Sequence, residues 1–304
     1  MIAIWGGGSA GSRYKTLVEE LGYKTILLSR DKNLNSFDFN TLNISEIEAA
    51  IICTPTVFHS EQSKLFLKNK IPVLCEKPIS HNYTSGKSIV ETARKYETKF
   101  HVGYNQRFLK AFKIFKDKRW GKPIKSKSIW AERVSDWQPD KNFKESYSVR
   151  SDLGGGAPLT LSHDFDWWTG IYNDLAVKDV SSSNDGTLGI SIDTKFEVSL
   201  MGSVDCDVIL NYEIDGPPIR YYETKYEDGT LKYEPLNSSL FFLKNNGEKL
   251  DFKIENDWNN TRLKSFQDTF CHFIEDERRP SELSDWELGL TALNVANIVN
   301  KWND

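Results

Sequence analysis

Short apolar runs alternate with stretches of helical spacing over the first hundred residues of the chain. The apolar runs predict strands at Ile2–Trp5, Thr25–Leu28, Ala49–Cys53, Pro72–Cys75 and Lys99–Val102. Helical spacing predicts helices at Ser9–Leu21, Ser60–Lys68 and Ser85–Tyr96. Continuously apolar strands separated by helices predict an α/β fold with a doubly wound parallel sheet of the Rossmann type. The polar stretch Asp31–Asn43 is short, so the second crossover is expected to be abbreviated.

After about Phe108 the pattern becomes that of a second, different domain. Strands are predicted at Ile124–Val134, Lys195–Met201, Val204–Tyr212, Ile219–Tyr226, Leu231–Tyr233 and Leu240–Leu243. The turns Glu227-Asp228-Gly229 and Asn245-Asn246-Gly247 separate some of them, which is typical of antiparallel hairpins. Two closing helices are expected at Arg262–Glu275 and Ser284–Trp302, the second with a capping box at Ser284. We therefore predict a Rossmann domain over 1–118 and an α+β domain over 119–304 with an open, mainly antiparallel sheet.

The turn after the first strand carries the first sign of chemistry. It reads Gly-x-Gly-x-x-Gly, with Ser9 and Ala10 between the last two glycines, Gly8 and Gly11. In a dinucleotide-binding turn, Gly6 permits the tight bend, Gly8 lets the backbone approach a pyrophosphate, and Gly11 lets the helix pack on the sheet. The phosphates would meet free N–H groups at the helix N-terminus.

The composition indicates which classes of protein and partner the chain fits. The chain has 304 residues, of which 39% are hydrophobic and 27% charged, as in ordinary soluble proteins of about two domains. Its net charge of −4 argues against nucleic acid or an anionic membrane as the partner. No apolar run could span a bilayer and no secretory signal is expected, so we predict a cytoplasmic location. The four cysteines are far apart, so reduced thiols and no metal site are expected.

Four further segments carry polar residues at places where a ligand would bind. They are Thr54-Pro55-Thr56-Val57-Phe58-His59, Glu76-Lys77-Pro78, Gly103-Tyr104-Asn105-Gln106-Arg107-Phe108, and Gly154-Gly155-Gly156 followed by His163. The first two follow predicted strands, and in an open α/β sheet ligands bind beyond the carboxyl ends of the strands. These two segments are therefore expected beside the glycine turn.

In this order and spacing the motifs resemble those of the Gfo/Idh/MocA oxidoreductases, named after glucose–fructose oxidoreductase and inositol dehydrogenase. The resemblance covers the whole chain: glycine turn, T-P-x-x-x-H, E-K-P, G-Y-N-x-R-F, then a triple glycine and a histidine. Ser135–Pro139, Glu145–Tyr147 and the triple glycine more loosely resemble a sub-branch encoded beside amino-sugar and nucleotide-sugar genes.

The resemblance implies two catalytic residues. Lys77 would lie near the nicotinamide and the reacting hydroxyl or carbonyl, where a partly desolvated lysine beside a cationic ring has a lowered pKa and can pass a proton. The Lys77–Pro78 bond is often cis in the family. His163 would hydrogen-bond the substrate oxygen or relay a proton, on a helix that begins near Pro158.

The chain departs from the family pattern just before His163. Relatives carry an aspartate three or four residues earlier, where this chain has Thr160 or Leu159. The aspartate orients the lysine and histidine, so its absence implies altered activity or another proton relay. Helical geometry turns Asp164 away from His163, whereas Asp166 falls near the same face and matches a structural aspartate of the family.

The choice of cofactor depends on the end of the second strand. NAD enzymes usually carry an acid there, and this chain has Ser29, followed by Arg30, which could pair with a 2′-phosphate. We predict NADP, with NAD possible if Asp31 takes the acidic position after a register shift. Other residues expected at the cofactor are Gly6, Gly8, Ser9, Ala10, Gly11, Thr54, Pro55, His59, Glu76 and Lys77.

Substrate contacts are expected from residues next to the family motifs. They are Tyr104, Asn105, Arg107, Trp137, Tyr147, Arg150, Thr160 and His163. Aromatic faces and polar groups suit a sugar, and Arg107 or Arg150 could bind a carboxylate or phosphate, although each could be an ordinary ion-pair residue.

These expectations combine into an NAD(P)-dependent oxidoreductase that interconverts a secondary alcohol and a ketone on a sugar. Amino sugars, nucleotide sugars and nonulose-type sugars are the expected substrates. The alternatives are an epimerase or lyase that retains its cofactor and oxidises transiently, or a non-catalytic homologue that binds a nucleotide or sugar. The resemblance also implies a homodimer or homotetramer formed through the C-terminal sheet.

Overall fold

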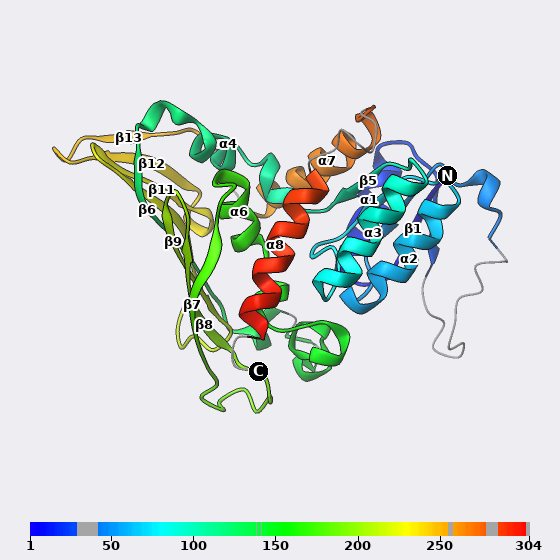
Figure 1. Ribbon diagram of the computed structural model, residues 1–304, viewed down its shortest axis with the longest axis horizontal. Helices are drawn as coiled ribbons and strands as arrows, with labels where there is room; N and C mark the ends of the chain where they lie inside the picture. Colours follow the sequence, from blue (N-terminus) through cyan, green and yellow to red (C-terminus); the bar gives the residue numbers. More distant parts are fainter. Residues whose placement is uncertain (29–41, 138, 141, 255–257, 278–284, 302–304) are drawn as a thin grey trace. The chain divides into compact units, whose positions relative to one another are not determined.

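The computed structural model describes residues 1–28, 42–137, 139–140, 142–254, 258–277 and 285–301. The chain forms two compact units (Figure 1). The first comprises Met1–Tyr104 with Phe266–Leu293, and the second comprises Asn105–Ser265 with Asn294–Asp304.

The first unit contains a parallel sheet of five strands in the order β2-β1-β3-β4-β5. The strands are β1 (Ile2–Trp5), β2 (Thr25–Leu28), β3 (Ala49–Ile52), β4 (Val73–Cys75) and β5 (Phe100–Val102). Helices α1 (Ser9–Glu20), α2 (Thr56–Lys68) and α3 (Tyr83–Lys95) lie between them in sequence. Every strand pair is parallel, which confirms the predicted Rossmann sheet.

Alternate residues of the first sheet face two different sets of helices. Ile2 and Ile4 are fully buried in a core cluster with Tyr14 of α1 and Phe270 of α7. Trp5 points to the other face, where its ring meets Phe66 of α2 edge-on at 6.0 Å between centroids. The sheet is therefore covered on both faces, which explains why its strands are apolar throughout.

The two C-terminal helices explain why the units differ from the predicted division at 118/119. They are α7 (Trp258–Glu275) and α8 (Asp285–Asn300). Phe266, Phe270 and Phe273 of α7 belong to the core cluster of the first sheet. The middle of this C-terminal segment therefore folds with the N-terminal unit. The capping box predicted at Ser284 lies outside the described residues.

The second unit contains a sheet of eight strands in the order β13-β12-β11-β10-β6-β9-β8-β7. The strands are β6 (Pro123–Ala131), β7 (Ala176–Ser183), β8 (Lys195–Met201), β9 (Asp205–Asn211), β10 (Ile219–Tyr226), β11 (Gly229–Glu234), β12 (Ser239–Lys244) and β13 (Lys249–Asp251). Among these pairs β6 and β9 are parallel and the others antiparallel, which confirms the predicted open, mainly antiparallel sheet.

One face of the second sheet is covered by aromatic residues of short helices. The helices are α4 (Lys110–Lys116), α5 (Ala157–Thr160) and α6 (His163–Ile171). The Trp167 ring stacks on that of Tyr222 at 4.1 Å, and the Trp168 indole donates a hydrogen bond to Ser128 Oγ at 3.0 Å. A single helix from Pro158 through His163 was predicted, but α5 and α6 are separate.

The remaining short elements are 3₁₀ turns. They lie at Ile44–Glu46, Asn105–Phe108, Lys118–Trp120, Val134–Trp137, Phe143–Glu145, Tyr147–Val149, Ser151–Leu153 and Pro235–Asn237. Four of them connect β6 to α5, the segment that carries several predicted substrate residues.

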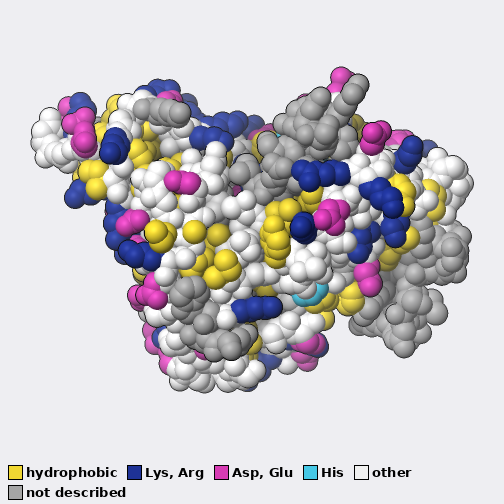
Figure 2. All heavy atoms as spheres, viewed as in Figure 1, with side chains coloured by type: hydrophobic (Ala, Val, Ile, Leu, Met, Phe, Trp, Pro, Cys, Tyr) yellow, Lys and Arg dark blue, Asp and Glu magenta, His cyan; other side chains and the backbone are white. Residues whose placement is uncertain are grey.

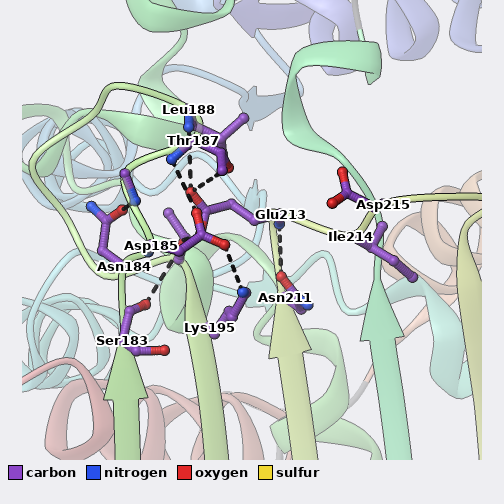
Figure 3. Close-up of polar contacts among 12 residues, drawn as sticks. Ser183, Asn184, Asp185, Thr187, Leu188, Lys195, Asn211, Glu213, Ile214 and Asp215 are labelled. Carbon is purple, nitrogen blue, oxygen red and sulfur yellow. Dashed lines mark hydrogen bonds and ion pairs between the residues drawn. The ribbon is translucent and has the colours of Figure 1, made fainter.

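A buried carboxylate, Glu213, anchors the loop between β7 and β8 (Figure 3). It accepts hydrogen bonds from the hydroxyls of Thr187, at 3.2 Å, and Thr194, and lies 3.4 Å from the backbone N–H of Leu188. Asp185 of the same loop pairs with Lys195 at 2.8 Å, and this contact lowers the pKa of Asp185. The loop is thus fixed at the end of the sheet where β9 finishes.

Charged side chains of both signs are interspersed on the face that Figure 2 shows. Within the part of the chain that the structure describes, no helix is both long enough and apolar enough to span a bilayer.

Candidate functional site

The carboxyl ends of neighbouring strands bring three of the predicted segments together in the first unit. Because β1, β3 and β4 are parallel and adjacent, the residues that follow them share one edge of the sheet. The Gly6 N–H donates to Leu28 O at 2.9 Å, and the Glu76 N–H donates to Ile52 O at 2.8 Å. The glycine turn, the segment from Thr54 and the Glu76-Lys77-Pro78 segment therefore line this edge.

The glycines of the first turn have distinct roles. A Cβ on Gly11 would lie 1.8 Å from the carbonyl oxygen of Gly6, so only glycine allows α1 to approach the turn this closely. Gly6 has a φ of +117°, and a Cβ there would meet the backbone of Cys53 at 2.6 Å. Gly8 has a φ of −74°, and its Cβ would meet no atom within 4 Å.

A dinucleotide fits this arrangement. The space that a Cβ of Gly8 would fill lies at the N-cap of α1, next to the first residues of the helix, Ser9 and Ala10. No acidic side chain occupies the first turn of α1, which leaves the positive end of the helix dipole for an anion. Ser29 and Arg30, on which the NADP prediction rests, lie outside the described residues, as does Asp31.

His59 ties two of the segments together. Its Nε2 lies 2.8 Å from Thr54 O and its Nδ1 3.0 Å from Pro78 O. The ring is 1% exposed, and burial lowers the pKa of His59 to about 4 against the opposing effect of these backbone contacts. At pH 7 the imidazole is neutral, so it can donate to one of the two carbonyls. His59 therefore holds the loops that flank Pro55 and Lys77 in place.

Glu76 and Lys77 follow β4 directly. The Lys77–Pro78 peptide bond is cis, as the resemblance implied. The Lys77 N–H contacts Glu76 Oε2 at 3.1 Å. Burial raises the pKa of the Glu76 carboxyl, while the charge of Lys77 acts in the opposite direction. Burial also raises the pKa of the neighbouring Tyr14 hydroxyl, and the Glu76 carboxylate adds to this effect. A buried acid thus precedes the proposed catalytic lysine.

The G-Y-N-x-R-F segment contributes buried residues to both units. Tyr104 ends the continuous part of the first unit and is 1% exposed. Asn105 begins the second unit, where its amide donates to Ser265 Oγ at 2.9 Å. Arg107 makes a forked ion pair with the buried carboxylate of Asp166, with Nε 2.9 Å from Oδ2. These contacts hold the segment against α6 and α7.

The loop between β6 and α5 packs on Tyr212, at the end of β9. Trp137 meets the Tyr212 ring edge-on at 5.4 Å, and the Tyr212 hydroxyl donates to Ser148 O at 3.3 Å. Burial raises the pKa of Tyr212, and a hydrogen bond with Thr160 acts against it. Tyr147 is partly exposed beside this cluster, and Arg150 forms an exposed ion pair with Asp152.

His163 begins α6 and lies against the second sheet. Its ring is nearly parallel to that of Trp130 in β6, with 6.4 Å between centroids. The guanidinium of Arg220 in β10 lies 3.6 Å from the Trp130 ring centroid, a cation–π contact. Trp130 and Arg220 are cross-strand partners, so the sheet register brings this charge close to His163.

Comparison with known proteins supports the Rossmann fold of the first unit and a nucleotide site at the carboxyl edge of its sheet. Residues 3–104 match the model of the oxidoreductase family with an NAD-binding Rossmann fold that is named for Gfo, Idh and MocA. Over these residues, about a third of its length, the chain is similar to the Gfo/Idh/MocA family. The matched region contains the glycine turn, the Thr54–His59 segment and Glu76-Lys77-Pro78.

The curated relatives of this chain have several activities. A myo-inositol 2-dehydrogenase of Thermotoga maritima is 34% identical over 71 residues, 23% of this chain and 21% of that protein. A 2,7-anhydro-N-acetylneuraminate hydratase of Mediterraneibacter gnavus is 27% identical over 153 residues, 48% of this chain and 39% of that protein. The matched segments thus span about a fifth and about two fifths of these curated relatives' lengths.

The similarity to solved structures extends over both units. A UDP-N-acetylglucosamine 3-dehydrogenase from Acidithiobacillus ferrooxidans superposes with a TM-score of 0.74 at 14% identity. The superposition covers 99% of this chain and 96% of that protein. At this level of identity the similarity establishes the fold of the chain.

A buried polar network beside His163 was not found from the sequence. The Tyr222 hydroxyl lies 3.0 Å from Gln106 Oε1 and 3.3 Å from Asp164 Oδ2, and Arg220 Nη2 donates to it at 3.2 Å. Burial raises the pKa of the Asp164 carboxyl to about 6, although the charge of Arg220 opposes this shift. The only indication in the sequence was Arg220. It is a charged residue at a position where the alternating pattern of its strand places side chains toward the core.

The raised pKa of Asp164 predicts a pH-dependent stability. An unfolded aspartate has a pKa near 4, so between about pH 4 and 6 the folded protein binds more protons than the unfolded chain. This contribution is fully present at low pH and is lost as the pH rises through 6. Relative to D164N, the free energy of unfolding of the wild type should fall by about 2 kcal/mol between pH 4.5 and 7.5.

Urea unfolding at both pH values measures this difference. D179N, which changes an exposed aspartate of β7 in the same unit, is the matched control and should show no such trend. A wild type that gains stability over D164N as the pH rises would show that Asp164 is ionised throughout.

Proposed function

We propose that the protein is an NAD(P)-dependent oxidoreductase that interconverts a secondary alcohol and a ketone on a sugar. The observation that carries this proposal is the shared sheet edge in the first unit. There the open space at Gly8, which suits a pyrophosphate, lies on the same edge as Lys77. When bound, the dinucleotide supplies the hydride donor or acceptor.

Lys77 passes the proton that must accompany hydride transfer. In the reducing direction its ammonium donates a proton to the carbonyl oxygen, and in the oxidising direction its amine accepts the hydroxyl proton. The hydrogen bond from the Glu76 N–H to Ile52 O and the contact of His59 with Pro78 O hold the backbone on either side of Lys77. His163 assists at the substrate oxygen, with Trp130 packed against its ring.

The substrate class follows from the polar and aromatic residues of the second unit. Trp137 and Tyr147 are partly exposed aromatic residues of the kind that stack on sugar rings, and the exposed Arg150, paired with Asp152, is of the kind that binds a carboxylate or phosphate. The name of the superposing Acidithiobacillus protein makes nucleotide-linked amino sugars the first candidates. Ser29 and Arg30 favour NADP as the cofactor.

A cofactor-retaining enzyme is the second candidate. Leu159 and Thr160 stand where the family aspartate would be, and both side chains are buried. Asp166 cannot readily replace that aspartate, because it is held by Arg107. A relative named as a hydratase is compatible with turnover that consumes no cofactor.

We also propose that the protein forms a homodimer or homotetramer through the outer face of the second sheet. Three large apolar side chains, Met201, Ile219 and Leu243, are exposed on the face opposite the buried side chains of their strands. Exposed apolar side chains on a sheet face are a common feature of homo-oligomer interfaces.

The two catalytic candidates are distinguished by one assay. The purified protein is mixed with NADPH or NADP⁺ and a panel of keto-sugars and sugar alcohols, and both nicotinamide absorbance and sugar products are followed. An oxidoreductase changes one sugar for each nicotinamide oxidised or reduced. Conversion of sugar without net change in nicotinamide supports the retained-cofactor enzyme. Bound dinucleotide with no conversion of any sugar would contradict both.

A further inference from the structure

Two histidines and an aspartate meet at the edge of the first sheet, away from the glycine turn. His101 is the middle residue of the edge strand β5, His272 lies near the end of α7, and Asp276 follows that helix. One ligand atom from each lies within 4.8 Å of the other two. All three residues belong to the first unit.

The local structure explains how these side chains converge. His101 pairs in register with Leu74 of β4, whose side chain belongs to the core that α7 covers, so the imidazole faces α7. His272 and Asp276 are four residues apart, and the Asp276 N–H donates to His272 O at 2.9 Å, which continues the helical spacing. The two side chains therefore lie on one face of the helix end.

The distances suit a single metal ion. His101 Nε2 lies 3.1 Å from Asp276 Oδ2, and His272 Nε2 lies 3.8 Å from the same oxygen. Two ligand atoms on a tetrahedral zinc ion, with bonds of about 2.0–2.1 Å, lie about 3.3 Å apart. The first distance is close to this value, and the second is longer by about 0.5 Å, which the half-exposed side chain of His272 can accommodate.

The charges around the cluster also favour a cation. The Asp276 side chain is 3% exposed, and a buried carboxylate needs a compensating positive charge. Lys99 supplies part of this charge, because it interacts with Asp276 while its ammonium donates to the backbone carbonyls of Ile274 and Asp276, at 3.2 and 3.0 Å. Glu277, the next residue, adds a second acid that interacts with Lys99.

We propose that His101, His272 and Asp276 bind a divalent transition-metal ion, with Zn²⁺ as the best match. Two imidazole nitrogens and a carboxylate oxygen are typical zinc ligands, and a water molecule on the exposed side of His272 completes the tetrahedron. The ion fastens strand β5 to the end of α7 and stabilises the first unit. The sequence predicted no metal site, because 170 residues lie between His101 and His272 and no short motif marks the three ligands.

Zinc titration of the full chain tests this proposal. The protein is prepared without a polyhistidine tag, stripped with a chelator and titrated with Zn²⁺ by calorimetry. The wild type should bind one ion per chain, and H272A and D276N should bind at least about tenfold more weakly. D268N, which removes another aspartate of α7, is the matched control and should bind as the wild type does.

Thermal unfolding gives a second readout that does not depend on activity. Saturating Zn²⁺ should raise the midpoint of the wild type and of D268N by roughly 5 °C, but not that of H272A. His272 is partly exposed, so H272A should fold even if D276N does not. The proposal is overturned if the wild type shows no saturable binding, or if H272A binds Zn²⁺ as tightly as the wild type.

Discussion

Replacing Lys77 with methionine should abolish most turnover while leaving dinucleotide binding intact. Methionine keeps most of the length and apolar surface of the side chain but cannot exchange a proton. Loss of a general acid or base typically lowers kcat by about 100- to 10,000-fold. The measurement is kcat with the sugar that reacts fastest in the assay described above, beside the dinucleotide affinity of the same sample.

K87M is the matched control for this variant. Lys87 lies on α3 of the same unit, and its side chain is 58% exposed. Its replacement should change neither kcat nor affinity by more than about twofold, since exposed ion pairs contribute little. If K77M turns over at the wild-type rate, Lys77 is not the general acid or base of the reaction.

Two glycine variants should separate cofactor binding from folding of the same turn. G8A should leave the free energy of unfolding unchanged, because its Cβ meets no atom within 4 Å and its φ of −74° suits alanine. The new methyl group would occupy the space for the pyrophosphate. Dinucleotide affinity should therefore fall by at least about tenfold, or roughly 1.4 kcal/mol.

G11A, in contrast, should lower the free energy of unfolding. Its Cβ would lie 1.8 Å from Gly6 O, so α1 must move away from the turn. Overpacking of this kind costs about 1–3 kcal/mol or more, which chemical unfolding would detect. If G8A binds the dinucleotide as tightly as the wild type in the same titration, the pyrophosphate does not lie at this turn.

The sequence predicted most elements of both sheets because their patterns are local. The apolar runs at Ile2–Trp5 and Thr25–Leu28 are strands with these bounds, as are the alternating runs at Lys195–Met201 and Ile219–Tyr226. β7 and β13 were not predicted. Both are edge strands with mostly exposed, polar side chains, so neither shows an apolar run or a clear alternation.

What the sequence could not predict depends on packing between distant segments. The amphipathic pattern of α7 indicates a buried face but not which core it joins, and Phe270 and Phe273 join the first sheet. The network of Asp164, Arg220 and Tyr222 likewise forms only when α6 lies on β10. Motifs at the ends of consecutive parallel strands were predictable because the topology itself brings them to one edge.

Titration of the purified protein with NADPH and with NADH, followed by nicotinamide fluorescence, tests the central claim most directly. The account predicts saturable binding of one dinucleotide per chain, tighter for NADPH than for NADH because of Ser29 and Arg30. Tighter binding of NADH would indicate that Asp31, rather than Ser29, contacts the ribose. Absence of saturable binding of either dinucleotide, to a protein that carries none already, would contradict the assignment of the glycine turn and the oxidoreductase function.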